Sequence, residues 1–81
     1  MPLFFFDLLS ESGVLRDDTG LEFDSAEIAY LEACKAIPGL SDELLRTGGT
    51  PLDHTFEVTD GARRLLWRIP FAEILGRKSL S

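Results

Sequence analysis

The sequence has one cysteine among 81 residues, so it cannot form an internal disulfide, which excludes the disulfide-stabilised miniproteins of the secretory pathway. It also has no apolar run of the roughly 18–20 residues that span a bilayer. The apolar N-terminus lacks the basic flank and the small-residue cleavage site of a signal peptide. These absences predict a soluble, cytoplasmic protein with no membrane partner.

Positive charge is also scarce, with eight Lys and Arg residues against fourteen Asp and Glu residues and a formal net charge of −6. Because an acidic domain repels phosphate backbones, we expect no nucleic-acid partner. Hydrophobic residues make up 44% of the chain, which is typical of a folded domain. The length allows one small domain, predicted over residues 1–76, followed by a frayed basic tail over residues 77–81.

Residues with distinctive chemistry are few. The single cysteine, Cys34, and the single histidine, His54, are too few for a four-ligand zinc site. We interpret Cys34 as a small buried hydrophobe and His54 as a residue at a strand entrance, hydrogen-bonded to a nearby loop. There is no Gly-rich phosphate loop, no G-x-S-x-G turn and no paired-carboxylate motif. We therefore expect no catalytic residue, no cofactor and no metal.

Two further groups of residues invite a functional interpretation. Pro2 would carry a secondary amine after removal of the methionine, and tautomerases use such an amine as a general base. Those enzymes pass directly from their first strand to a helix, whereas a second strand intervenes here, so an enzyme of this kind is only the alternative hypothesis. Around Gly20 lies an acidic cluster without the ligand spacing of a calcium loop, which indicates turn chemistry and a helix cap. Its members are Asp17, Asp18, Glu22 and Asp24.

Four segments have the composition or the alternation of β-strands, and one long segment has helical periodicity. The predicted strands are residues 2–9, 14–17, 54–60 and 64–69. The helix is predicted to begin with Asp24 as its N-cap and Glu27 three residues later, as in a capping box. Pro38 and Gly39 are predicted to interrupt it, and Ser41 to cap a second short helix.

This order predicts an α+β fold, β-β-α-β-β, with a four-stranded, mainly antiparallel sheet and one Pro-interrupted helical layer on one face. A right-handed crossover favours the strand order 2-1-3-4, with 2-1-4-3 as the alternative. The expected core of the sheet is Phe4, Phe6, Leu8, Phe56, Val58, Leu65, Trp67 and Ile69. The expected apolar face of the helix is Ala26, Tyr30, Ala33 and Ile37.

The chain resembles a family of small proteobacterial proteins classified as a domain of unknown function. The resemblance rests on Met-Pro-x-Phe-Phe-Phe-Asp-Leu at the N-terminus, on Asp-Thr-Gly-Leu-Glu-Phe before the helix with its Glu32-Ala33, on Phe56-x-Val58-x-Asp60 and on Leu65-x-x-x-Ile69-Pro70-Phe71. It covers nearly the whole chain, to about Leu75. The family has no assigned activity, so the resemblance supports the fold and implies no function.

Strand alternation sends one set of apolar side chains away from the helix. The expected interface residues on this open face are Leu3, Phe5, Leu9, Leu66 and Arg68. One helical layer covers only one face of a sheet, so we predict a noncatalytic interaction module that forms a homodimer through this face, or binds an unidentified protein partner there. One alternative stays open, in which the segment Phe71–Leu75 folds back over the face. The arginines Arg63, Arg64 and Arg68 form a small basic patch, which we interpret as a solvated face or as a partner for the acidic cluster around Gly20 and not as a phosphate site.

Overall fold

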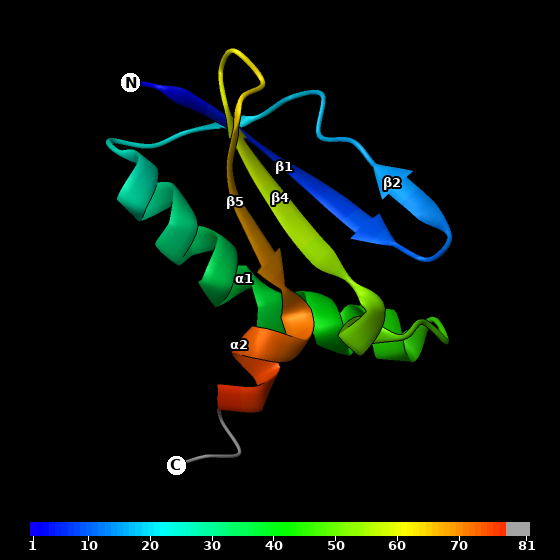
Figure 1. Cartoon of the computed structure of the whole chain (residues 1–81). Helices are drawn as coiled ribbons and strands as arrows, with labels where there is room; N and C mark the ends of the chain where they lie inside the picture. Colours follow the sequence, from blue (N-terminus) through cyan, green and yellow to red (C-terminus); the bar gives the residue numbers. More distant parts are fainter. Residues whose placement is uncertain (78–81) are drawn as a thin grey trace.

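The computed structural model describes residues 1–77, and its sheet is built around the aromatic N-terminal strand (Figure 1). The elements in chain order are β1 (Leu3–Ser10), β2 (Gly13–Leu15), β3 (Leu21–Glu22), α1 (Ala26–Arg46), the 3₁₀ helix η1 (Pro51–Asp53), β4 (Thr55–Asp60), β5 (Leu65–Pro70) and α2 (Phe71–Arg77). All strand pairs are antiparallel, in the order β2-β1-β4-β5. This is the favoured prediction, 2-1-3-4. Most of the predicted tail lies outside the described residues.

The sheet has one strand more than the sequence predicted. β3 is only two residues long and pairs with β1 at Leu3 and Phe4, whereas β2 pairs with β1 at Leu8 to Ser10. Two short strands therefore share one edge of β1 and leave its middle without a strand partner on that side. The carboxylate of Asp17 fills this gap by accepting the N–H of Phe6 at 3.0 Å.

The predicted break in the helix at Pro38 and Gly39 is wrong, because α1 runs without interruption through both residues. An internal proline costs about 3 kcal/mol. On either side of it, Ile37 and Ser41 are buried, and the Ser41 hydroxyl donates to the Ile37 carbonyl at 2.8 Å instead of capping a second helix. We attribute the continuity of α1 to this packing, which offsets the proline's local preference.

The predicted cap is wrong by one residue, because Ser25 and not Asp24 is the N-cap of α1. The hydroxyl of Ser25 accepts the N–H of Ile28 at 3.2 Å, and its extended backbone is the conformation of a cap. Asp24 is exposed. Both residues are good caps by type, so composition could not decide between them.

Replacement of Ser25 by alanine should therefore lower the free energy of unfolding by about 0.5–2 kcal/mol. The matched replacement of Asp24 by alanine should change it by less than half as much. Urea denaturation of the two variants measures the difference. A larger loss from Asp24→Ala would mean that the helix begins one residue earlier than described.

The core lies between the sheet and α1. Its buried cluster is Ala33, Ile37, Phe56, Val58, Ile69 and Phe71, and Phe4 and Ala29 are also buried. Tyr30 is half-buried and packs on Trp67, with ring centroids 5.2 Å apart. The predicted inward face of the sheet is confirmed apart from Leu65, which is 51% exposed.

The position of Leu65 follows from a β-bulge. Between Val58 and Thr59 the partner strand advances by two residues, from Trp67 to Leu65, so the alternation of β5 shifts there. Leu65 thereby pairs with Thr59, which pairs on its other side with Phe5. Directly opposed residues share a face, so Leu65 belongs with Phe5 on the side away from α1.

The C-terminal helix α2 lies on the same side of the sheet as α1 (Figure 1). Phe71, its first residue, is fully buried, packs on Phe56 at 5.2 Å between ring centroids, and belongs to the cluster that contains Ile37. Its N–H donates to the carbonyl of His54 at 2.9 Å. The alternative in which Phe71–Leu75 covers the open face is therefore wrong for the described residues.

Candidate interaction surface on the open face of the sheet

We call the side of the sheet that faces away from α1 and α2 the open face. The strand registers place its side chains in rows, because directly opposed residues point to the same side. One row joins Val14, Leu9 and Thr55; the next joins Asp7, Glu57 and Arg68; a third joins Phe5, Thr59 and Leu65. The open face therefore has apolar side chains towards both ends and charged side chains across its middle.

The five predicted interface residues all belong to this face by register or alternation. Leu3, Phe5 and Leu9 are half-buried, whereas Leu66 and Arg68 are exposed. The sequence prediction missed two further apolar members, Val14 at 60% exposed and Leu65 at 51% exposed. Pairing the short return strand with β1 through its tight turn would have identified Val14. No local signal marks the bulge that moves Leu65.

The middle of the open face is covered by Arg63, which the sequence prediction placed in a basic patch that was either solvated or paired with the acidic cluster. Its guanidinium lies 3.9 Å from the centre of the Phe5 ring, within cation–π distance. The same group donates to both carboxylate oxygens of Asp7 at 3.2 Å and to the backbone carbonyl of Asp17 at 2.7 Å. Asp7 is only 6% exposed. One side chain from the β4–β5 turn thus neutralises a buried carboxylate and covers an aromatic ring.

Backbone geometry positions Arg63 for these contacts. Its φ is +66°, the only positive φ of a non-glycine residue in the described chain, which L-residues adopt at a cost of roughly 1–2 kcal/mol. The turn is held by Asp60, whose carboxylate accepts the N–H groups of Ala62 and Arg64 at 2.9 Å each. These bonds and the charge of Arg64 lower the pKa of Asp60.

Asp17 connects this cluster to the edge of the sheet. Its N–H donates to Asp7, and its carboxylate accepts the N–H groups of Phe6, Thr19 and Gly20. Gly20 is required in this turn, because its φ is +75° and a Cβ would lie 2.9 Å from the carbonyl oxygen of Phe4. Burial by itself would raise the pKa of Asp17, but the three backbone N–H groups and the Arg63 charge outweigh it, so the pKa is lowered.

This direction predicts a pH dependence for the variant Asp17→Asn. The pKa of Asp17 is lower in the folded state than in the unfolded chain, where it is about 3.9. The ionised carboxylate therefore stabilises the fold at pH values above the unfolded-state pKa. This contribution is lost as the pH falls through the folded-state pKa. Hydrogen bonds to a charged group contribute about 1.5–3 kcal/mol, so the variant should be less stable than wild type by about that amount at pH 7. The gap should shrink as the pH falls below about 4.

Urea midpoints of wild type and Asp17→Asn between neutral pH and acid measure this gap. The matched control is Asp18→Asn at the neighbouring exposed aspartate, which should show little gap at any pH. A gap for Asp17→Asn that stays constant into acid would show that the carboxylate charge has no part in its effect.

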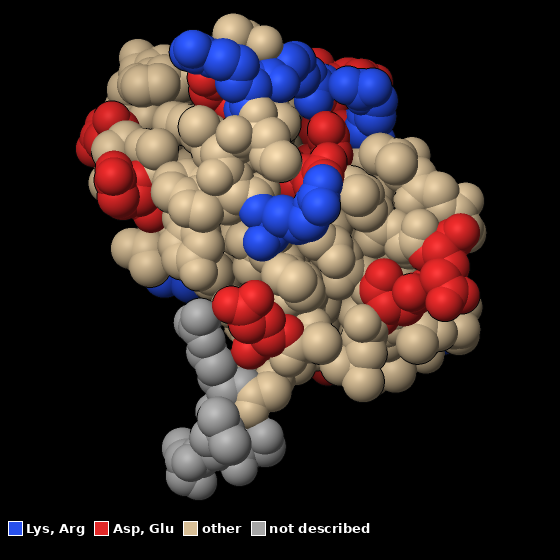
Figure 2. Space-filling model, in the orientation of Figure 1, with Lys and Arg blue, Asp and Glu red and all other residues tan. Residues whose placement is uncertain are grey.

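The arginines of the β4–β5 hairpin are all paired with carboxylates. Arg63 pairs with Asp7, while Arg64 and Arg68 bind Asp60 at 2.9 Å and Glu57 at 2.6 Å. Figure 2 shows basic side chains gathered at the end of the molecule where this turn lies, with acidic side chains among them. Such an arrangement neutralises much of the charge of the patch.

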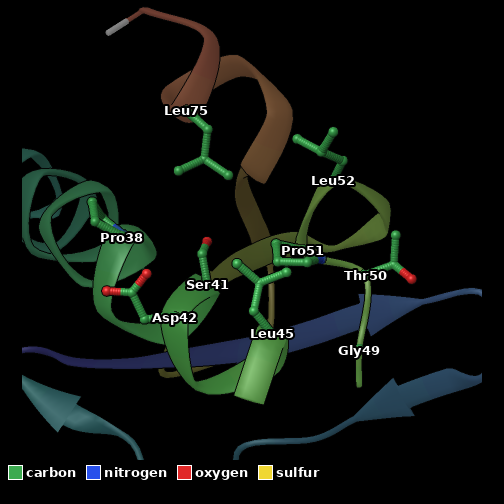
Figure 3. A pocket seen from close by; sticks show the side chains of 9 residues that line it. All are labelled: Pro38, Ser41, Asp42, Leu45, Gly49, Thr50, Pro51, Leu52 and Leu75. Carbon is green, nitrogen blue, oxygen red and sulfur yellow. The ribbon is translucent and has the colours of Figure 1, made fainter. Parts of the chain in front are cut away.

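A shallow apolar depression of about 510 Å³ lies on the other side of the molecule, where α1, η1 and α2 meet. Figure 3 shows Leu45, Pro51, Leu52 and Leu75 bordering it. Asp42 is the only charged residue among those lining it, and the Ser41 hydroxyl is already bonded within α1. The depression therefore brings together no acid–base pair or nucleophile.

The other residues singled out in the sequence occupy structural positions. His54 follows η1 directly, and its Nδ1 lies 2.8 Å from the carbonyl oxygen of Thr50 in the preceding loop, as predicted. Cys34 is half-buried and packs against the core cluster. Pro2 is exposed, and its carbonyl accepts the N–H of Phe23 at 3.2 Å. Within residues 1–77, no group of three or more His, Cys, Asp or Glu side chains is arranged to hold a metal ion.

The fold and this surface describe a small α+β domain with an exposed sheet face. The chain belongs to the family described as domain of unknown function DUF6894, whose family model matches residues 3–72. No curated protein and no solved structure shows significant similarity to it. No helix among the described residues has the length and apolar character needed to cross a membrane.

Proposed function

We propose that the protein is a noncatalytic interaction domain whose open face pairs with the same face of a second copy to form a two-fold homodimer. The observation that carries the proposal is the position of α2. Because Phe71 anchors α2 beside α1, no described element covers the open face. Apolar side chains gathered on one exposed face are typical of a binding surface, and a two-fold pairing is the commonest way to bury them.

The dimensions of the molecule support this pairing. The domain is flat, with extents of 34, 31 and 17 Å, and the open face is one of its two broad sides. A broad side of this size is comparable with the roughly 800 Å² that each partner contributes to a standard interface. A face-to-face dimer therefore needs no additional element from the chain.

The charges in the middle of the open face also support burial against a partner. Asp7 is already paired with Arg63, and Glu57 with Arg68, across neighbouring strands or turns. Removing an ion pair from water is tolerated when both members stay bonded, whereas an unpaired buried charge costs several kcal/mol. The apolar ends of the face can thus be covered without leaving these four charges unpaired.

Nothing in the geometry favours the tautomerase alternative. All three arginines of the hairpin hold carboxylates of the protein itself, so they offer no free cationic group to a substrate carboxylate near Pro2.

An interaction domain with a lone thiol and no disulfide would work in the reducing cytoplasm, as expected from the sequence.

The test is a pair of charge insertions at the two apolar ends of the open face, Leu9→Glu and Leu66→Glu. Phe5→Glu is less suitable, because Arg63 lies over that ring and would pair with the new carboxylate. The matched control is Leu52→Glu, a 66% exposed leucine bordering the depression between α1, η1 and α2.

Light scattering coupled to size exclusion should give twice the monomer mass of 9.0 kDa for wild type and for Leu52→Glu. It should give the monomer mass for Leu9→Glu and Leu66→Glu, with circular dichroism unchanged. A wild type that stays monomeric at millimolar concentration would refute the proposal, as would a dimer that both insertions leave intact.

A further inference from the structure

A second apolar surface lies on the inner side of the sheet, beside α1, and is independent of the open face. α1 packs over β4 in the middle of the inner side and also contacts β1 and β5, with Ile37 beside Val58 and Tyr30 on Trp67. Phe23 covers the beginning of β1 by packing on Phe4 and Phe6. In the described part of the chain, the inner side of β2 and the adjoining end of β1 are left beside α1 without a helix over them.

This part of the inner side is hollow. Two adjoining depressions of about 280 and 400 Å³ share Phe6, Asp17 and Phe56 in their lining. A third, of about 290 Å³, shares Leu8 and Leu15 with the second and continues to Leu44. We call the three together the inner groove. Within residues 1–77 no element fills it.

The inner groove has two walls, one on α1 and one on the edge segment that pairs with β1. On α1, the lining residues Glu32, Ala36, Leu40 and Leu44 recur at every fourth position and form one continuous flank, which is inclined to the helix axis. This flank is about 18 Å long at 1.5 Å per residue, which is more than three helical turns. The opposite wall carries Leu15 and Leu21, which are 70% and 56% exposed although they pair with the inward residues Leu8 and Phe4.

The charge around the inner groove selects the kind of helix that fits it. Asp17 and Glu32 line it, and Asp18 is exposed beside Asp17, against one lining arginine, Arg16, and Lys35, which pairs with Glu32 at 3.3 Å. The whole chain carries a net charge of −6, so a second copy would bring the same excess of negative charge. A basic partner is favoured over a second copy at this site.

We propose that the inner groove binds an amphipathic α-helix of another protein, with an apolar stripe towards Phe6 and Leu40 and lysine or arginine residues along its flank. The bound helix lies beside α1 and completes the helical layer over β2 and the adjoining end of β1. Apolar residues spaced at i, i+3, i+4 and i+7 would provide the contacts, as in other helix-in-groove complexes.

The probe is a synthetic helix of about 15 residues, four turns, with leucine on one face and lysine elsewhere. Its control has the same pattern with glutamate in place of lysine. Binding to the full chain is measured by fluorescence anisotropy, and the contact surface is mapped by amide chemical-shift changes. Two matched variants accompany wild type. Ala36→Gln places a larger neutral side chain in the inner groove, and Ala72→Gln makes the same change at an exposed position of α2.

We expect the lysine peptide to bind at least about tenfold more tightly than the glutamate peptide, with shift changes at Leu15, Ala36 and Leu40. Ala36→Gln should weaken binding about tenfold, and Ala72→Gln less than twofold. Equal effects of the two variants, or shift changes confined to other surfaces, would overturn the proposal. It would also be overturned if Ala36→Gln converted a wild-type dimer into monomers, because the groove would then hold a second copy. The open-face variants leave this assay unaffected, so the two proposals fail separately.

Discussion

Replacement of Phe71 by alanine should lower the free energy of unfolding by about 3–5 kcal/mol. Its ring is fully buried between Phe56 and His54, with centroid separations of 5.2 and 5.8 Å. Loss of the ring leaves a cavity at the point where α2, β4 and α1 meet. Since domains are stable by about 5–15 kcal/mol in total, this variant should be close to unfolded at physiological temperature.

Urea denaturation followed by circular dichroism measures the loss, with Leu52→Ala as the control. Leu52 is close in sequence but 66% exposed, so its truncation should change the unfolding free energy by less than about 0.5 kcal/mol. If Phe71→Ala lowers the unfolding free energy no more than the control does, Phe71 does not anchor α2 on the core. The structural reason for expecting an uncovered open face would then no longer hold.

Arg63→Ala should be the most damaging substitution of a charged residue, with a loss of about 2–4 kcal/mol. The Asp7 carboxylate would stay buried and keep only the N–H of Asp17 as a partner. This expected loss in unfolding free energy lies towards the low end of the range for breaking a buried ion pair, because the side chain of Arg63 is itself 31% exposed. The double variant with Asp7→Ala should be less destabilised than the sum of the two single variants.

Arg63→Gly separates the backbone of this residue from its side chain. Glycine loses the same ion pair but adopts φ of +66° without strain, so it should be about 1 kcal/mol more stable than Arg63→Ala. Thermal unfolding of both variants provides the comparison. Alanine and glycine variants of equal stability would show that Arg63 is not held in a strained conformation, and wild-type stability in both would show that Asp7 needs no cation.

Strand composition and alternation were enough to predict the main strands, because the Phe-rich segment and the alternation of Phe56 and Val58 are typical of strands and not of helices. The preference for right-handed crossovers favoured the strand order that the structure shows. Local signals failed where packing decided the outcome. Pro38 and Gly39 indicate a break, but burial of Ile37 and Ser41 on either side keeps α1 intact. Alternation along its strand predicts Leu65 as a core residue, but the β-bulge in the pairing of β4 with β5 turns its side chain outward.

The candidate surface was predictable only in part. The alternation of side chains along the strands placed five residues on one face, namely Leu3, Phe5, Leu9, Leu66 and Arg68. The contact of Arg63 with Asp7 spans 56 residues of sequence and depends on a positive φ, which neither composition nor periodicity reveals. The position of α2 likewise depends on which side of the sheet receives Phe71 after Pro70, and Phe71 packs in the buried cluster that contains Ile37.

The most direct test of the central proposal, the homodimer through the open face, is an isotope-filtered nuclear Overhauser experiment on a mixture of labelled and unlabelled chains. Only contacts between two copies give signals in this experiment. The open-face pairing predicts intermolecular signals from the methyl groups of Leu9, Val14, Leu65 and Leu66, and none from Leu15 or Leu40 in the inner groove. Signals confined to the inner-groove methyl groups, or no intermolecular signals at millimolar concentration, would contradict it.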